Sequence, residues 1–338
     1  MRVVRLTKFG LDGLALEEAT DPAPGAGEVL LRVRAVSLNY RDVLIARGQY
    51  DSRYKLPLVP CSDAACEVVA VGDGVTDVRA GERVSPIFSR GWHDGPPTRE
   101  TPRRALGGPN DGTLAELIVA AAGDVAKVPA YLDDAEAATL YCAGLTAYRA
   151  LFELSATNER TRVLVLGTGG VSTFAVSLAR AAGADVTVVS RDAGKLERAL
   201  ALGATRGFCS TDVPNWGVPV RDATNGGVEQ VIDVAGGSTL AEALHAVRPG
   251  GTISLIGASA GGRGAASATP SLLPAVMREV RLQGVLVGPK SSFVAFAGAL
   301  ERWRLRPVID AKFPLSNARA AFERLANESP FGKVVVTL

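Results

Sequence analysis

Residues 162–191 read RVLVLGTGGVSTFAVSLARAAGADVTVVSR, and this stretch decides the fold. Arg162–Leu166 is a short apolar, β-branched run, typical of a strand that is buried on both faces. A glycine turn follows at Gly167–Gly170, then a helical pattern over Val171–Ala182 and a second apolar strand over Val186–Val189. The order predicts a βαβ unit with its tight turn at the carboxyl end of the first strand. In such units the turn lets the backbone approach the pyrophosphate of a dinucleotide.

The turn and the start of the helix are therefore the predicted cofactor-binding segment. It comprises Gly167, Thr168, Gly169, Gly170, Val171 and Ser172. The match to G-x-G-x-x-G is imperfect, because Ser172 stands where the third glycine would be. The alternative interpretation is a tight glycine turn in an α/β domain that binds no ligand.

The end of the second strand predicts which nucleotide is bound. NAD-binding proteins usually place a carboxylate there to accept the ribose hydroxyls. This chain has Ser190 and Arg191, with Lys195 one turn further on, and these side chains suit a 2′-phosphate better. We therefore expect NADPH. Asp192 is the counter-argument, since a carboxylate at that position facing the ribose would weaken the preference.

Composition excludes several classes of partner. The chain has 338 residues, 47% hydrophobic and 21% charged, with a net charge of +2. Two domains are expected for this length, and neither a nucleic-acid nor a membrane partner is indicated. The N-terminus lacks the apolar core of a signal peptide. The four cysteines show no C-x-x-C spacing, so we expect reduced thiols in a cytoplasmic protein.

The pattern of elements changes along the chain. The first 125 residues indicate β-strands and turns, and residues 89–112 form a long polar loop. From Arg162 onward, apolar strands alternate with helices, which predicts a parallel sheet. The expected strands there are 162–166, 186–190, 206–209, 229–234, 252–256 and 280–287. The small-residue stretch 258–269 is expected to be a mobile connection.

Several motifs together resemble the medium-chain dehydrogenase/reductase superfamily. They are SLNYRD (37–42), VVAVGDGVTDVRAGERV (68–84), DGTLAEL (111–117), AATLYCAGLTAY (137–148), GTGGVS (167–172), KLERALALGA (195–204) and FGKVVV (331–336). The nearest branch is the zinc-independent, quinone-oxidoreductase-like one, related to the alcohol dehydrogenases. The resemblance implies an α/β fold with two domains. A GroES-like, β-rich catalytic domain would span 1–125, completed by 290–338, and a Rossmann domain with a doubly wound parallel sheet would span 126–289.

The resemblance also bears on metal binding. In zinc-dependent relatives the catalytic ligands are a Cys, a His-Glu pair and a later Cys or His. Here the matching positions hold Asn39, Ser62-Asp63 and Cys142. A catalytic zinc needs three protein ligands, so we expect no metal, and Cys142 is better explained as a packed thiol.

The predicted catalytic residues are Asn39, Tyr50 and Asp42, with an amide donor at Asn39 for a developing negative charge. Tyr50 matches a tyrosine of related enoyl reductases, but an aromatic packing role is an equal alternative. Asp42 could instead form a structural ion pair with Arg41. Asp63 could be a buried hydrogen-bond acceptor that holds the helix rather than a catalytic base. Further predicted cofactor contacts are Thr146, Gly257, Val287 and Lys333; Lys333 would approach the phosphates or else remain an exposed lysine.

These observations predict a zinc-free, NADPH-dependent oxidoreductase. It would transfer hydride to a quinone or to the activated alkene of an α,β-unsaturated carbonyl. One alternative is an alcohol/carbonyl oxidoreductase of the alcohol dehydrogenase type, and another is a non-catalytic NADPH-binding redox sensor. The strand at Arg281–Val287 should be last in its sheet, and its open edge predicts a homodimer.

Overall fold

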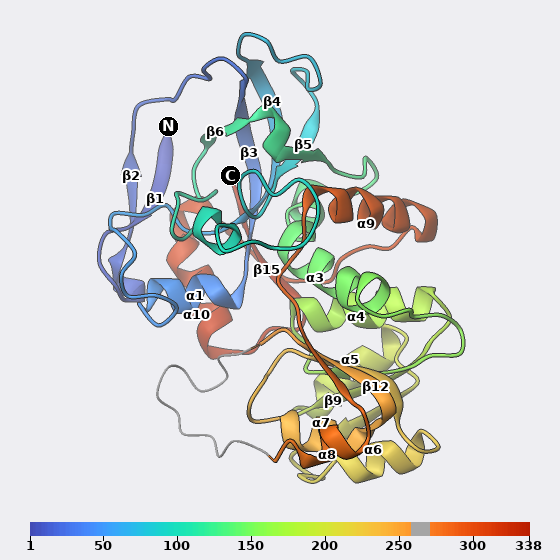
Figure 1. Cartoon of the computed structure of the whole chain (residues 1–338). Coiled ribbons are helices and arrows are strands. Elements are labelled where there is room, and N and C mark those ends of the chain that lie inside the picture. The colour runs from blue at the N-terminus through green and yellow to red at the C-terminus, as the bar shows by residue number, and fades with distance from the viewer. Residues whose placement is uncertain (258–270) are drawn as a thin grey trace. The chain divides into compact units, whose positions relative to one another are not determined.

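The computed structural model describes residues 1–257 and 271–338, which divide into two compact units (Figure 1). The first unit contains Met1–Leu145 and Val287–Leu338, and the second contains Thr146–Leu286. The connection expected at 258–269 lies outside the described residues.

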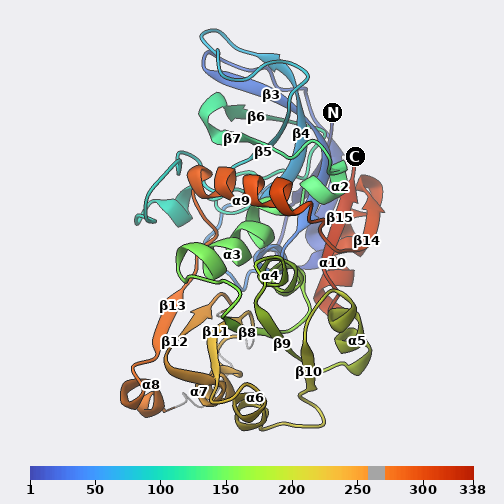
Figure 2. The same cartoon turned by 90° about the vertical axis from the view of Figure 1, so that its right-hand side faces the viewer.

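The second unit is built on a parallel sheet (Figure 2). Among the described residues this sheet has six strands in the order β10-β9-β8-β11-β12-β13. They are β8 (Arg162–Leu166), β9 (Asp185–Ser190), β10 (Arg206–Cys209), β11 (Val228–Asp233), β12 (Val247–Leu255) and β13 (Arg281–Gly284). This order reverses direction between β8 and β11, as in a doubly wound dinucleotide-binding fold. The predicted fold class is confirmed for this unit.

Helices connect these strands. They are α4 (Gly170–Ala181), α5 (Ala193–Ala201), α6 (Gly217–Ala223), α7 (Leu240–Ala246) and α8 (Leu273–Met277). The strand expected at 280–287 is shorter, because pairing with β12 ends at Gly284. Its place at the edge of the sheet is as predicted.

The first unit is a mainly antiparallel β structure. Within the described part of the chain, its larger sheet has seven strands: β14-β15-β3-β4-β5-β7 in order, with β6 also paired to β3. Their bounds are β3 (Glu28–Leu38), β4 (Asp63–Val71), β5 (Arg83–Pro86), β6 (Leu117–Ala121), β7 (Val125–Lys127), β14 (Ile309–Pro314) and β15 (Lys333–Thr337). A separate pair is formed by β1 (Arg2–Leu6) and β2 (Leu14–Glu18). The β-rich prediction for this part is confirmed.

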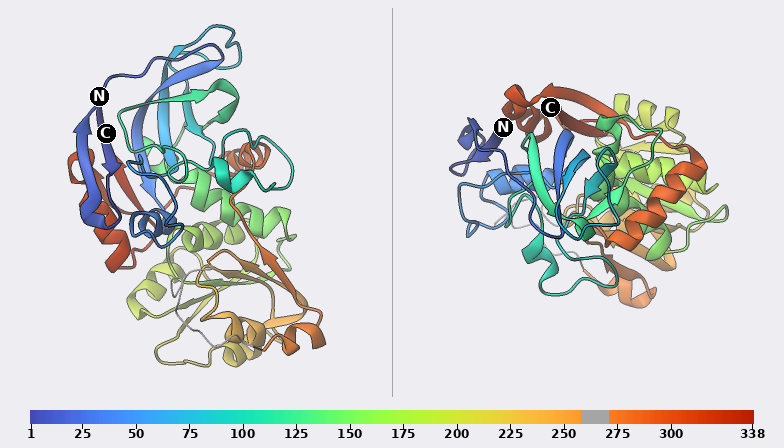
Figure 3. Two further views of the ribbon diagram at one scale, coloured as in Figure 1. Left: turned by 60° about the vertical axis from the view of Figure 1, so that its left-hand side comes forward. Right: turned by 90° about the horizontal axis from the view of Figure 1, so that it is seen from above.

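Short helices and turns complete the first unit, and both chain termini lie in it (Figure 3). The α-helices are α1 (Tyr40–Ala46), α2 (Asp134–Ala137), α9 (Lys290–Trp303) and α10 (Ala318–Asn327). Single 3₁₀ turns occur at η1 (Leu11–Gly13), η2 (Thr101–Arg104), η3 (Ala122–Asp124) and η6 (Leu315–Asn317). The buried residues of α10, such as Phe322, join the same apolar core as Val334 and Val336 of β15.

The boundaries between the units fall at 145/146 and 286/287, whereas the sequence predicted 125/126 and 289/290. Residues 126–145 fall in the first unit because β7 pairs with β5 and α2 packs on β3 and β4. The crossing into the second unit runs through α3 (Leu145–Tyr148), between the π-helical turns η4 (Leu140–Gly144) and η5 (Arg149–Glu153). Residues 140–153 therefore do not form one regular α-helix.

A search of the described residues for a helix long and apolar enough to cross a bilayer finds none.

Candidate active site

Three distant segments meet at the carboxyl end of β3. The antiparallel neighbours β4 and β15 both begin there, since Ser37 pairs with Asp63 and Leu38 pairs with Val334. One step further along the register, Lys333 lies across from Asn39, which follows β3 directly. Opposite residues of an antiparallel pair are close neighbours. The sheet therefore brings Asn39, Asp63 and Lys333 together, although 294 positions separate Asn39 from Lys333.

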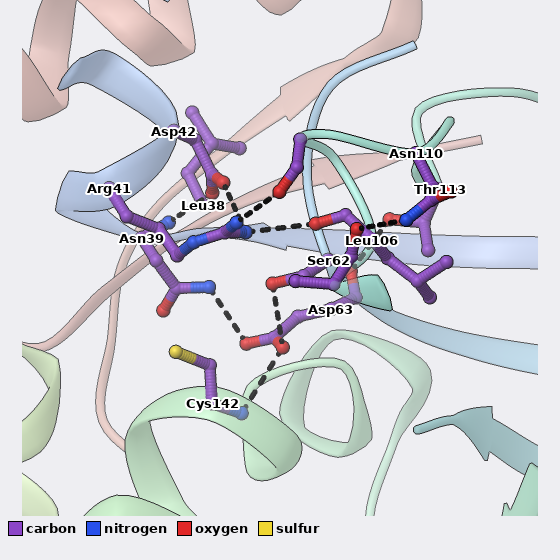
Figure 4. A network of polar contacts seen from close by, with 12 residues as sticks. Leu38, Asn39, Arg41, Asp42, Ser62, Asp63, Leu106, Asn110, Thr113 and Cys142 are labelled. Atoms are coloured by element: carbon purple, nitrogen blue, oxygen red, sulfur yellow. Dashed lines mark hydrogen bonds and ion pairs between the residues drawn. The ribbon is translucent and has the colours of Figure 1, made fainter. Parts of the chain in front are cut away.

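Both ends of the Asn39 side-chain amide are hydrogen-bonded (Figure 4 shows the Asp63 side). Asn39 Nδ2 donates to Asp63 Oδ2 at 3.0 Å, and Asn39 Oδ1 accepts from Lys333 Nζ at 2.5 Å. Asn39 precedes α1, where such a side chain usually caps the helix. Asn39 and Asp42 form a capping box at the start of α1, and the amide oxygen of Asn39 also accepts from Lys333. We call Asn39, Asp42, Asp63, Cys142 and Lys333 the Asn39 cluster.

Two fully buried carboxyl groups belong to this cluster. Burial raises the pKa of Asp42 to about 6, against the opposing charge of Arg41. Burial also raises the pKa of Asp63, while the Lys333 ammonium at 4.0 Å acts to lower it. Asp42 Oδ2 accepts the backbone N–H of Asn39 at 2.8 Å, but its Oδ1 has no hydrogen bond with any described residue. Asp63 therefore organises the site, and Asp42 holds the start of α1.

Arg41 ties the long loop to this site (Figure 4). Its guanidinium donates to the carbonyls of Leu106 at 3.0 Å and Gly108 at 3.1 Å, and lies 3.6 Å from Asp42 Oδ1. It also lies 5.6 Å from the ring centre of Tyr50. Tyr50 is 40% exposed, and no hydrogen bond to the Asn39 cluster is found in the part of the chain that is described. The catalytic roles of Tyr50 and Asp42 therefore stay predictions.

The donor set at these positions does not fit a zinc ion. The oxygens of Asp63 accept from Asn39 Nδ2 and, at 3.1 Å, from the Cys142 backbone N–H. Burial raises the pKa of the Cys142 thiol, which opposes the thiolate form that metals bind. Lys333 brings a cation into the same cluster. Among residues 1–257 and 271–338, no group of three or more His, Cys, Asp or Glu side chains could hold a metal ion.

The glycine turn of the second unit has the geometry that a phosphate requires. Gly167 has φ = +77°, a conformation that favours glycine, and its N–H donates to Val189 O. A Cβ on Gly169 would meet nothing within 4 Å, so the backbone here faces open space. α4 begins directly after Gly169, and no side chain of the described residues caps it. Its first N–H groups therefore remain for an anion.

The remaining residues of this segment are Thr168, Gly170, Val171 and Ser172. Ser172, at the third-glycine position, is buried and donates its hydroxyl to Leu166 O at 2.8 Å. The serine thus ties α4 to β8. A dinucleotide fits this turn, which would bind its phosphates.

The residues predicted to set the preference for NADPH or NADH lie at the end of β9. Ser190 is buried at the strand end, Arg191 is exposed, and Lys195 lies in the first turn of α5. Asp192 caps α5: its Oδ1 accepts the Lys195 backbone N–H at 3.0 Å, and its Oδ2 lies 3.7 Å from Lys195 Nζ. This carboxylate is thereby engaged with its own helix.

The other predicted cofactor contacts are Thr146, Gly257, Val287 and Lys333. Thr146 is buried in α3. Gly257 follows β12, where a Cβ would come within 1.8 Å of Val234 O, so only glycine allows that approach. Val287 is buried at the start of the second segment of the first unit. Lys333 is also buried, and its ammonium is bonded within the Asn39 cluster. Each cofactor role stays a prediction.

Sequence reasoning missed Asp233, at the carboxyl end of β11. Its Oδ1 accepts from the N–H groups of Ala235 and Gly236 and from the Thr239 hydroxyl, at 2.8 to 3.0 Å. Burial raises its pKa, whereas these donors lower it. The carboxylate shapes the loop beside the glycine turn, since Val234 would contact a Cβ on Gly167. An aspartate at the end of an expected strand, shortly before Gly236-Gly237, was the available signal.

Comparison with known proteins identifies the family. The model of the alcohol dehydrogenase GroES-like domain matches residues 25–130, and that of the zinc-binding dehydrogenases matches residues 170–302. A zinc-type alcohol dehydrogenase-like protein of Schizosaccharomyces pombe is 38% identical over 97% of this chain and 96% of its own length. A quinone oxidoreductase of Rattus norvegicus is 29% identical over 100% and 98%.

Solved structures point to the same family. A putative alcohol dehydrogenase from Sinorhizobium meliloti 1021 has a TM-score of 0.92 and 37% identity, covering 100% of this chain and 98% of that one. The fold of this family implies a nicotinamide cofactor, and its members include proteins named alcohol dehydrogenase and quinone oxidoreductase. The chain belongs to the medium-chain dehydrogenase/reductase superfamily of oxidoreductases.

Proposed function

We propose that this protein is a zinc-independent, NADPH-dependent reductase that transfers hydride to a quinone or to the activated alkene of an α,β-unsaturated carbonyl. The observation that carries the proposal is the buried Asn39 amide, which is hydrogen-bonded to Asp63 and Lys333 where the donor set does not suit zinc. Such an oriented donor can stabilise negative charge on an acceptor's oxygen.

The bound nicotinamide would supply a hydride. The quinone oxygen or the enone oxygen then gains negative charge, which conjugation delocalises, and a proton completes the reduction. Asn39 Nδ2 would donate a hydrogen bond to that oxygen, and Tyr50 is the proposed proton donor or packing group. Quinones and enones suit such a site because they need less stabilisation than an isolated alkoxide.

NADPH is favoured over NADH by the residues at the end of β9. Ser190 and Arg191 offer donors to a 2′-phosphate, whereas Asp192 is occupied as the cap of α5. Arg191→Ala should weaken NADPH binding by about 10- to 100-fold and leave NADH nearly unchanged, as expected for one charge-assisted hydrogen bond. Arg221→Ala, on α6 of the same unit, is the control. Equal losses for both nucleotides would place Arg191 away from the phosphate.

The alternative activity is alcohol/carbonyl oxidoreduction, which the names of the S. pombe and S. meliloti relatives favour. The test is NADPH consumption by metal-analysed protein against quinones, enones and simple aldehydes. If the protein turns over quinones or enones at a rate that a chelator does not lower, the proposal is supported. Turnover of aldehydes alone, lost with chelator and restored by zinc, would replace it. The relatives named alcohol dehydrogenase and quinone oxidoreductase favour an enzyme over the non-catalytic sensor.

A homodimer is also proposed. β13 is an edge strand, and the adjacent α8 exposes Leu273, Val276 and Met277, the last two by 72% and 74%. An open strand edge beside exposed apolar side chains favours pairing with a second copy. The expected cytoplasmic location stays a prediction.

A further inference from the structure

A buried ammonium group lies at the start of β15 and is given no direct role in the proposed hydride transfer. The side chain of Lys333 is 3% exposed. Its Nζ donates to Leu38 O at 2.7 Å and to Asn39 Oδ1 at 2.5 Å, and lies 4.0 Å from Asp63 Oδ2. Burying a charged group is costly unless it is paired and hydrogen-bonded, so these contacts explain how the ammonium is tolerated.

The chemistry of the three groups allows one orientation of the Asn39 amide. An ammonium has only donors, so it must face the amide oxygen, and a carboxylate has only acceptors, so it must face the amide nitrogen. Turning the amide over would place Nδ2 against Lys333 and Oδ1 against Asp63. Both contacts would then be repulsive.

We propose that Lys333 is a positioning residue, which fixes Asn39 so that one Nδ2 proton binds Asp63 and the other is presented to the acceptor's oxygen. Within the described residues Nδ2 makes one hydrogen bond, to Asp63, so its second N–H remains available. This inference rests on the proposed function for the role of that second N–H. The orientation itself rests on the contacts alone.

The inference differs from a phosphate-binding role for Lys333. The ammonium has two acceptors, Leu38 O and Asn39 Oδ1, and lies 4.0 Å from Asp63 Oδ2. A lysine engaged in this way acts on Asn39 rather than on a nucleotide. The two roles predict different effects on NADPH affinity.

The first experiment compares Lys333→Met in the wild-type and Asn39→Ala backgrounds. We expect kcat for a benzoquinone to fall about 10- to 100-fold in the wild-type background, since loss of a fully placed oxyanion donor costs about 100- to 1,000-fold. In the Asn39→Ala background Lys333→Met should have no further effect. Lys333→Arg, which keeps a cation with donors, should recover most of the activity. Lys312→Met, on the neighbouring strand β14, is the matched control.

The result that would overturn the inference is an equal fold loss in both backgrounds, because Lys333 would then act without Asn39. A rise in NADPH dissociation constant of about tenfold in both backgrounds would assign Lys333 to the phosphates instead.

A second measurement does not depend on turnover. Asparagine-selective ¹⁵N labelling of the full chain would detect the Asn39 side-chain amide, which Asn39→Ala identifies by its absence. We expect one slowly exchanging proton, bonded to Asp63, and faster exchange or broadening in Lys333→Met. An amide signal unchanged by Lys333→Met overturns the inference. A changed signal in a protein inactive on quinones and enones supports the positioning and refutes only the proposed function.

Discussion

Asp63→Asn is the most informative substitution in the Asn39 cluster, because it changes one atom and keeps the shape. Asp63 accepts two N–H donors, one on each oxygen: Asn39 Nδ2 at 3.0 Å and the Cys142 backbone at 3.1 Å. An asparagine at 63 has one acceptor and one donor. Either way round, its NH₂ group faces another N–H donor. Asn39 cannot turn over to relieve this, because Lys333 holds its oxygen.

The cost follows from these contacts. A buried donor left without an acceptor costs about 1–3 kcal/mol, and breaking a buried ion pair costs about 3–5 kcal/mol. We expect Asp63→Asn and Lys333→Met each to lower the free energy of unfolding by about 3–5 kcal/mol. The double variant frees Asn39 to turn, so that its oxygen accepts from the new NH₂ and no member of the pair remains charged. It should cost less than the sum by about 2–3 kcal/mol.

The assay must report the first unit alone. Trp92 and Trp303 lie in this unit, and Trp216 lies in the second. In a Trp216→Phe background, tryptophan fluorescence during urea unfolding therefore follows the first unit. Additive costs, with a coupling energy below about 0.5 kcal/mol, would refute the argument that Lys333 and Asp63 fix one amide orientation.

Three further predictions follow from other residues. Burial raises the Asp42 pKa from 3.8 to about 6, so the wild-type fold loses stability as pH rises from about 4 to 6, and the full loss is present above about pH 6. The stability of Asp42→Asn relative to wild type should rise by about 2 kcal/mol between pH 4 and 7; a flat difference would contradict this. Ser172→Gly completes the glycine motif but removes a buried hydrogen bond and adds a helical glycine, so thermal unfolding should show a loss of about 1–2 kcal/mol with no gain in NADPH affinity by titration. Val276→Glu should convert the dimer to monomer by light scattering, whereas Val294→Glu on α9 should not, and a monomeric wild type would end the dimer proposal.

Local sequence was sufficient for the second unit because its signals are contiguous. The strand, glycine turn, helix and strand of 162–190 form one βαβ unit from neighbouring residues, and the structure confirms it. Buried parallel strands require continuous apolar runs, which are readable without knowledge of their partners. The boundaries of this unit along the chain were harder to predict. The first unit extends to Leu145, since the partners of β7 and α2 are distant in sequence.

Side-chain roles depended on contacts between distant residues. From the sequence, Asp192 was weighed as a residue that could face the ribose, and its hydrogen bond from the Lys195 N–H makes it the cap of α5. Arg41 was readable as a partner of Asp42, yet it also holds the carbonyls of Leu106 and Gly108. Hydrogen bonds to main-chain groups far along the chain leave no pattern in the sequence.

The sequence by itself therefore determined the family, the order of the strands and helices in the nucleotide-binding unit, and Asn39 as a candidate residue. Only the tertiary structure decided that Lys333 lies beside Asn39 and Asp63. The reason is physical: antiparallel pairing of β15 and β4 with β3 brings positions 39, 63 and 333 to one end of a sheet. Strand register, rather than any local motif, creates the charge pattern that orients the amide.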